Sequence, residues 1–357
     1  MVTPHQFRRS RERLIRVCES VAGADAVSLR RELLQEIRGA VRFDAYAWVL
    51  TDPETSVGVA PLADVPSALR PELPRLIRLK YLTMVNRWTR PGCWAASLHE
   101  ATGGDLSKSL LWREVLARHD VIDVASVVFR DAFGCWGFLD LWRTGDAAPF
   151  SAAETAFLAA INQPTTAALR RCQALSFAIP QEPTAQRVAP VVLLLSTDLE
   201  VAGQTPATEG YLRQLVPPGE GAAPVPAGAY NVAAQLLAVE AGVDTHPPSA
   251  RVHVRDGVWL TLRADRLSGT ESLGAGTIAV TIEEASPAER ADLFARAFGF
   301  TAREKELFGY LISGLDTRGV AQRMFLSEHT VQDHLKSIFS KTAVRNRRAL
   351  LSRALGT

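Results

Sequence analysis

The four cysteines of the 357-residue sequence form no Cys-x-x-Cys pair. Cys18, Cys93, Cys135 and Cys172 therefore predict neither a disulfide framework nor a zinc ribbon, and their sparse use is typical of proteins in a reducing cytosol. No run of about eighteen apolar residues occurs, and no apolar stretch of signal-peptide length follows the arginine-containing start. We expect a soluble, cytoplasmic protein with no membrane segment.

The sequence also lacks the short motifs of common catalytic sites. It contains no G-x-x-x-x-G-K-[ST], H-E-x-x-H, G-x-S-x-G or G-x-G-x-x-G. Residues 101–109, ATGGDLSKS, lack the spacing of a phosphate-binding loop and are more typical of a helix cap. The sequence shows no aspartate-and-lysine arrangement of a phospho-receiver. We expect no enzyme activity and no cofactor.

Charge is distributed unevenly along a chain of ordinary globular composition. Of the 40 Lys and Arg and the 38 Asp and Glu, residues 301–357 contain 10 and 5, which leaves 30 and 33 in the rest. The length predicts two or three domains. A basic tail attached to a mildly acidic body predicts a tail that binds a polyanion and a body with another role.

The first half of the body shows an α+β pattern. Apolar residues at helical spacing predict two helices within 3–41. Ser151 and Glu154 form a capping box at the start of a later helix, which Pro164 is expected to kink. Between these helices lie three strand-like segments, the last two joined as a hairpin: 45–51, 124–131 and 136–143. The proline-rich stretch 179–190 predicts a linker.

A second, smaller α+β unit follows the linker. Asp256-Gly257 lies between alternating apolar residues and predicts a hairpin, and residues 216–228 predict a surface excursion. Ser286, Pro287 and Glu289 predict the start of a linker helix over 286–298. The remaining strands and short helices are expected at 191–201, 211–216, 230–242, 250–267 and 277–285.

Four helices are predicted in the basic tail. Thr301 and Glu304 form another capping box, and Gly314 marks the end of that first helix. Asp316 or Thr317 can cap the second helix, and Ser327 can cap the third after a tight turn. The last helix is expected near 346–355. Two short helices around a tight turn describe a helix-turn-helix.

The tail resembles a known family at many positions with fixed spacing. These positions are Thr301-Ala302-Arg303-Glu304, Gly314-Leu315, Ala321, Ser327, Thr330-Val331, His334, Ile338, Lys341, Val344 and Arg347. They are similar to the LuxR-type four-helix DNA-binding domain. The resemblance implies that residues 299–357 bind double-stranded DNA as a homodimer, with RNA polymerase as a further partner. Arg318-Gly319-Val320 and Thr342-Ala343 depart from the family pattern.

The third tail helix is expected to turn its apolar face inward and its polar face to DNA. The candidate base contacts are Gln332, Asp333 and Lys336. The candidate phosphate contacts are Ser327, Thr330, Lys341, Arg345 and Arg347. Each cation could instead be an ordinary solvated charge. The alternative function is a protein-interaction adaptor whose tail has lost DNA affinity, and Asp333 and Gly319 favour it.

The body resembles sensor domains. Residues 30–52 and 136–161 carry a resemblance of 1–178 to a GAF-like sensor domain, and 191–212 and 251–267 carry a resemblance of 188–285 to a PAS-like domain. The predicted fold class is therefore α+β multidomain, in which GAF-like and PAS-like α+β domains precede an all-α four-helix helix-turn-helix domain. The resemblance implies a body that senses a small ligand or mediates dimerisation.

Six of the seven tryptophans lie between residues 48 and 142. The predicted ligand pocket contains Trp88, Trp94, Trp112 and Trp136, with Cys93, His99 and His119 as polar members. For any single tryptophan, burial in an ordinary core is the alternative. Cys93, His99 and His119 lack the spacing of metal ligands, so no metal site is expected.

Overall fold

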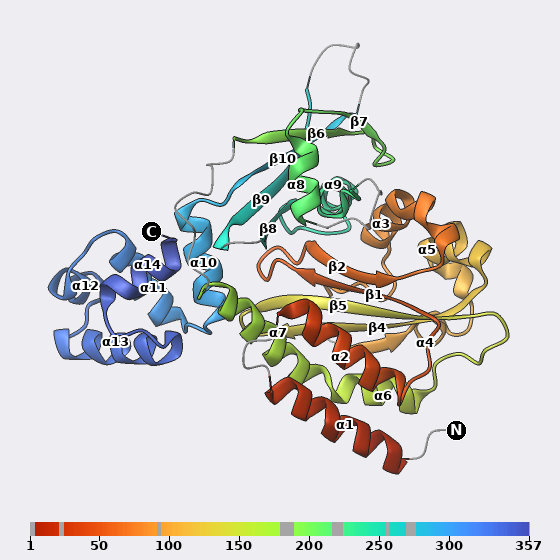
Figure 1. Ribbon diagram of the computed structural model, residues 1–357, viewed down its shortest axis with the longest axis horizontal. Coiled ribbons are helices and arrows are strands. Elements are labelled where there is room, and N and C mark those ends of the chain that lie inside the picture. The colour runs from red at the N-terminus through yellow and green to blue at the C-terminus, as the bar shows by residue number, and fades with distance from the viewer. Residues whose placement is uncertain are drawn as a thin grey trace.

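The computed structural model describes residues 4–20, 25–90, 94–178, 189–215, 224–254, 257–268 and 276–356. Figure 1 shows two sheets with their helices and, to one side, a group of C-terminal helices. The α+β class of the body and the all-helical tail are as expected from the sequence. Several predicted features lie outside the described residues: Cys93, Asp256 of the hairpin turn, and most of 179–190 and 216–228.

The first unit is built on a five-stranded antiparallel sheet of order β2-β1-β5-β4-β3. The strands are β1 (Ala45–Thr51), β2 (Gly58–Asp64), β3 (Ala95–Ser97), β4 (Val121–Asp131) and β5 (Gly134–Thr144). The predicted strand at 45–51 and the predicted hairpin are confirmed. Gly134 opens β5 at a φ of 151°, and a Cβ there would collide with the Pro53 carbonyl. The hairpin therefore needs glycine at this position.

Helices cover both faces of this sheet (Figure 1). One face carries α1 (Pro4–Glu19), α2 (Ala26–Arg38), α6 (Ala152–Ala160) and α7 (Asn162–Ser176), and the other carries α3 (Leu73–Leu82) and α5 (Leu110–Glu114). The Ser151–Glu154 capping box is confirmed. The helix breaks at Ile161 rather than at Pro164, because Pro164 lies in the first turn of α7, where no N–H is needed. Shorter helices are α4 (Leu98–Thr102), η1 (Ser67–Glu72), η2 (Leu106–Lys108) and η3 (Leu116–His119).

The second unit has its own antiparallel sheet of order β7-β6-β10-β9-β8. Its elements are β6 (Val191–Leu195), β7 (Val201–Gln204), α8 (Thr208–Leu215), α9 (Ala227–Glu240), β8 (Ser249–His253), β9 (Trp259–Arg266) and β10 (Ile278–Glu284). Helix α9 packs on this sheet and also against α3 and β2 of the first unit. Many of its residues are small, and residues on nearly all sides of the helix are buried, because the two units enclose it.

A buried arginine joins the two units to the next helix, α10 (Pro287–Ala297). Arg251 on β8 places its Nε 2.7 Å from Asp52 Oδ2 and its Nη2 2.9 Å from Asp52 Oδ1. The same guanidinium lies 2.9 Å from a Glu54 carboxylate oxygen and 3.1 Å from an Asp292 carboxylate oxygen. Asp52 and Glu54 belong to the first unit and Asp292 to α10, so one side chain connects three segments.

An aromatic cluster packs α10 against the body and the tail. Phe294 of α10 lies with its ring centroid 5.2 Å from that of Phe177 and 5.8 Å from that of Phe308 in the tail. Phe177 in turn stacks on Trp259 of β9 at 4.9 Å. The tail is thus packed on the body, and the predicted linker helix, with its Ser286–Glu289 capping box, is part of a shared core. None of the helices in the described ranges is both long and apolar enough to cross a membrane.

Replacing Arg251 by Met should lower the free energy of unfolding by about 3 to 5 kcal/mol, because Asp52 would remain buried without its partner. The matched control is Arg263→Met on the neighbouring strand, where the arginine pairs with Glu283 and Glu289 at the half-exposed surface. That change should cost less than about 1 kcal/mol. Urea unfolding of both variants measures the difference. Equal losses would show that Arg251 does not hold the units together.

Candidate nucleic-acid interface

Four capped helices form the tail. They are α11 (Ala302–Ile312), α12 (Thr317–Met324), α13 (Glu328–Thr342) and α14 (Arg347–Leu355). The side chains of Thr301, Asp316, Ser327 and Asn346 each accept a hydrogen bond from the backbone N–H three residues later. Each cap satisfies a backbone donor that the helix itself leaves free. The caps predicted at Thr301, Asp316 and Ser327 are therefore confirmed.

The turn between α12 and α13 is short and strained. Phe325 closes α12 in the left-handed region, at a φ of 54°, and its side chain is 95% exposed. Leu326 turns back, and its N–H donates to the Ala321 carbonyl at 2.9 Å. Only three residues separate α12 from α13, so the two helices form a helix-turn-helix.

Helix α13 has one buried face and one exposed face. Val331, Leu335 and Ile338 are buried against the other tail helices, as predicted. Gln332, Asp333 and Lys336, the predicted base contacts, are all exposed. They come from one stretch of the helix that follows the turn, which is the part of a helix-turn-helix that enters the major groove.

The exposed charges of α13 pair with one another. Lys336 Nζ lies 3.1 Å from Asp333 Oδ1, and His329 Nε2 lies 3.6 Å from Asp333 Oδ2. The hydrogen bond from Lys336 lowers the pKa of Asp333 below its ordinary value. The carboxylate is therefore ionised at neutral pH and partly balanced by its neighbours. Gln332 Nε2 lies 3.5 Å from Thr317 Oγ1 at the start of α12.

Four of the five predicted phosphate contacts form hydrogen bonds within the tail. Ser327 Oγ caps α13 and lies 2.9 Å from Thr330 Oγ1. Arg347 donates from Nη2 to the Leu311 carbonyl at 3.1 Å, which satisfies an acceptor at the end of α11. Arg345 is exposed in the turn between α13 and α14.

Lys341, although exposed, forms an ion pair with a buried carboxylate. Its Nζ lies 2.6 Å from Glu304 Oε2 and 3.0 Å from the Gly299 carbonyl. Glu304 is 3% exposed, and it also accepts hydrogen bonds from Ser337 Oγ at 2.7 Å and from the Thr301 N–H at 2.6 Å. The sequence predicts Lys341 as a phosphate contact, but the structure uses it to join α13 to the start of α11.

The two departures from the family pattern are accommodated locally. The Gly319 N–H donates to the Asp316 cap at 2.8 Å, and a Cβ at Gly319 would lie 3.1 Å from the same carboxylate oxygen. Glycine thus lets the cap approach closely. Ala343 ends α13 in the left-handed region, at a φ of 51°. An alanine there costs about 1 kcal/mol relative to glycine, but the turn is formed.

The structure does not bring the four predicted pocket tryptophans around one cavity. Trp88 and Trp136 are buried in different clusters, and Trp94 is half exposed. Trp112 donates from Nε1 to the Val121 carbonyl at 2.7 Å and borders a smaller hollow. A cavity of about 820 Å³ lies elsewhere, between the first unit and α9 of the second, and among the described residues Trp142 is the tryptophan that lines it.

Of the predicted polar members of that pocket, His99 and His119 do not line the 820 Å³ cavity either, and Cys93 lies outside the described residues. His119 Nε2 lies 3.0 Å from Glu72 Oε1, and the His99 N–H donates to Asp123. Within the ranges that the structure describes, no cluster of three or more His, Cys, Asp or Glu side chains has the geometry to bind a metal ion.

Glu304→Gln should destabilise the tail in a pH-dependent way. Burial raises the pKa of Glu304, but hydrogen bonds from Lys341, Ser337 and Thr301 outweigh it and lower the pKa to about 2. A lowered pKa gives stability above the ordinary value near 4.5, and this stability is lost as the pH falls through about 2. Urea unfolding should show a loss of about 2 to 3 kcal/mol at pH 7 and about half of that near pH 3.

The control is Glu306→Gln on the same helix, where the carboxylate pairs with exposed Arg303 at 2.8 Å. It should change the free energy of unfolding by less than about 0.5 kcal/mol at either pH. A pH-independent loss for Glu304→Gln would contradict the assigned ion pair.

Comparison with known proteins agrees with the geometry of the tail. Residues 299–354 match the family of bacterial regulatory proteins named the luxR family. The CsgBAC operon transcriptional regulatory protein of Escherichia coli strain K12 is 43% identical over 52 residues, which are 15% of this chain and 24% of that protein. The monoamine regulon transcriptional regulator of Klebsiella aerogenes is 42% identical over 53 residues, 15% of this chain and 23% of that protein.

The match thus spans about a quarter of the length of these relatives. It covers the four helices, their caps and the turn between α12 and α13. The C-terminal domain of this chain is therefore a helix-turn-helix domain of the luxR family.

Proposed function

We propose that the protein is a cytoplasmic transcriptional regulator that acts as a homodimer. In each protomer, α13 would contact duplex DNA. The observation that carries the proposal is the exposed polar face of α13, directly after the turn of a capped helix-turn-helix. The relatives that match this domain are named as transcriptional regulators, which supports the same reading. A dimer would present two such helices to two half-sites of an operator.

The phosphate contacts proposed on the structure differ in part from those of the sequence. Lys341 and Arg347 are engaged within the tail, whereas Arg345 is exposed. Other exposed cations surround the helix-turn-helix and can neutralise phosphates on either side of the groove. They are Arg318 and Arg323 on α12 and Arg348 on α14.

The body, in this proposal, is a GAF-like and PAS-like unit that senses a small ligand or mediates dimerisation, without catalysis. RNA polymerase is a further proposed partner. The contacts of α10 with Phe177 after α7, with β9 and with α11 support such a role, because the DNA-binding domain packs on the proposed sensor body. The second candidate is a protein-interaction adaptor, which the almost fully exposed ring of Phe325 favours.

Binding of the full chain to duplex DNA should depend strongly on salt. If a dimer neutralises about 6 to 10 phosphates, the association constant should fall about 10³- to 10⁵-fold between about 50 and 200 mM salt. Fluorescence anisotropy with a labelled duplex measures this slope. An affinity that does not change with salt, or no binding at the lowest salt, would favour the adaptor.

Lys336→Ala should weaken binding selectively. Lysine can donate to guanine O6 and N7, so the variant should lose about 1 to 3 kcal/mol on a duplex selected for tight binding and much less on a scrambled duplex. Gln332→Ala should show the same pattern, because glutamine can bind adenine through two hydrogen bonds.

Asp333→Asn should raise affinity for both duplexes, because it removes a charge that phosphates repel.

The matched control is Arg303→Ala, which removes an exposed cation of α11 that pairs with Glu306. It should leave the preference for the selected duplex unchanged. If Lys336→Ala and Gln332→Ala weaken both duplexes equally, α13 does not read bases.

A further inference from the structure

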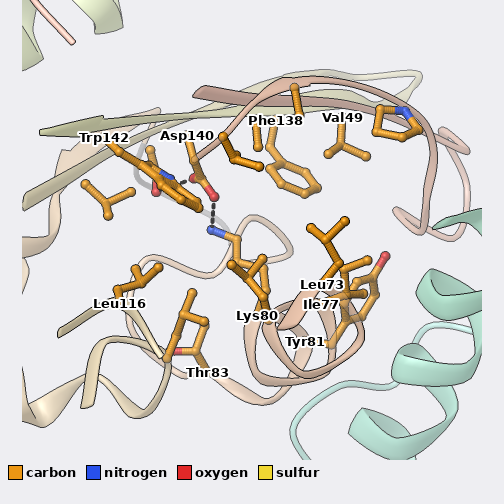
Figure 2. A pocket seen from close by; sticks show the side chains of 18 of the residues that line it. Val49, Leu73, Ile77, Lys80, Tyr81, Thr83, Leu116, Phe138, Asp140 and Trp142 are labelled. Atoms are coloured by element: carbon orange, nitrogen blue, oxygen red, sulfur yellow. Dashed lines mark hydrogen bonds and ion pairs between the residues drawn. The ribbon is translucent and has the colours of Figure 1, made fainter. Parts of the chain in front are cut away.

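The cavity of about 820 Å³ lies between the sheet of the first unit and α3. Figure 2 shows Val49, Phe138 and Trp142 on the side of the sheet and Leu73 and Ile77 on the side of α3. Most of the other side chains that line it are also apolar. Its volume is that of pockets that enclose small organic molecules.

A buried ion pair joins the two sides of the cavity (Figure 2). Lys80 Nζ of α3 lies 2.7 Å from Asp140 Oδ2 of β5, and the two side chains are 11% and 8% exposed. Ser126 on the paired strand β4 donates to Asp140 Oδ1 at 2.6 Å. The pair is neutral as a whole. An ammonium group has three donors, so Lys80 can still donate to an acceptor atom inside the cavity.

The second unit contributes a polar group to the same cavity. Asn231 of α9 lines it and is 6% exposed. Its side chain ends in an amide, which can both donate and accept hydrogen bonds. Gly58 leaves room for this amide, because a Cβ on Gly58 would lie 2.9 Å from Asn231 Nδ2. A bound molecule with a polar group can therefore form a hydrogen bond with this amide.

We propose that this cavity binds an uncharged, mainly apolar organic molecule with a carbonyl-type oxygen that accepts a hydrogen bond from Lys80. The inference rests on the sensing role proposed for the body and gives that role a site and a ligand class. The charge of the occupant follows from the ion pair. The other two charged residues of the lining, Asp64 and Arg70, are exposed, so they do not supply a buried counter-charge. A carboxylate or an amine beside the neutral pair would therefore be buried without compensation, which is costly.

The occupant would also contact both units of the body. Lys80 and the sheet residues belong to the first unit, whereas Asn231, Ala227 and Val225 belong to the second. A bound molecule would therefore stabilise the packing of α9 against α3, because it would bind only when the two walls of the cavity are together.

The test uses the full chain and Nile red, a neutral dye with a carbonyl oxygen whose fluorescence rises in apolar surroundings. Three competitors of similar size differ in charge: methyl octanoate, octanoate and octylammonium. We expect Nile red to bind and methyl octanoate to displace it at a concentration about tenfold or more below that of either ion, as the cost of burying a charge requires. No dye binding, or equal displacement by all three, would overturn the proposal.

Variants of the ion pair should change this preference in opposite directions. Asp140→Asn leaves Lys80 unbalanced, so octanoate should become the best competitor. Lys80→Met leaves Asp140 unbalanced, so octylammonium should become the best. The control is Arg75→Met on α3, which removes a surface pair with Glu114 and should leave the order unchanged. An unchanged order in both cavity variants would overturn the role of the pair.

If a single variant fails to fold, two others keep the test decisive. Lys80→Met with Asp140→Asn is neutral and should bind methyl octanoate about tenfold more weakly, with no gain for either ion. Ile77→Trp fills the cavity and should abolish dye binding. If neither variant changes dye or ester binding, the cavity is not the site. DNA binding measured on the same samples separates this result from a failure of the proposed regulator, because the ligand assay contains no DNA.

Discussion

The guanidinium of Arg251 is the group on which the arrangement of the molecule depends most. It lies between two parts of the chain that are 199 residues apart, and it also contacts α10. Burial alone would lower the pKa of Arg251, but its hydrogen bonds to Asp52 outweigh this effect and raise the pKa. Asp52 is buried as well, so neither charge is stable in its place without the other. The relative position of the two units and α10 is therefore fixed by this buried ion pair, because separating the units would leave both charges uncompensated.

Two further contacts extend this constraint. Arg87 of the first unit lies 2.6 Å from Asp244 of the second, and both side chains are buried. Phe294 connects α10 to Phe177 in the first unit and to Phe308 in the tail. The DNA-binding domain thus shares a core with the body, and the proposed ligand cavity has walls from both units. A change in the packing of the two units would alter the contacts of α10, and α10 also packs on the DNA-binding domain. We propose this connection as the physical basis for regulation.

The sequence predicts those features that depend on residues close together in the chain. Ser327 and Thr301 are recognised as caps because their partners lie three residues away. The alternation of buried Val331 and exposed Gln332 on α13 follows from helical periodicity. The ion pair of Lys341 is not foreseen, because its partner Glu304 lies 37 residues away, on a different helix. The four tryptophans grouped from the sequence lie apart in the structure for a similar reason. Composition does not reveal which rings face the same cavity. The edge strand β2 is not predicted from the sequence, because Pro61 interrupts the alternation of residues that is typical of a strand.

The central claim is that α13 lies on DNA while the body remains away from it. Hydrogen–deuterium exchange of the full chain, with and without a tightly bound duplex, tests this claim most directly. The account predicts slower exchange in α12, the turn at Phe325 and the first turns of α13, with little change in the five-stranded sheet that holds the cavity. Protection confined to the body, or none in α13 under conditions where the duplex is bound, would contradict it.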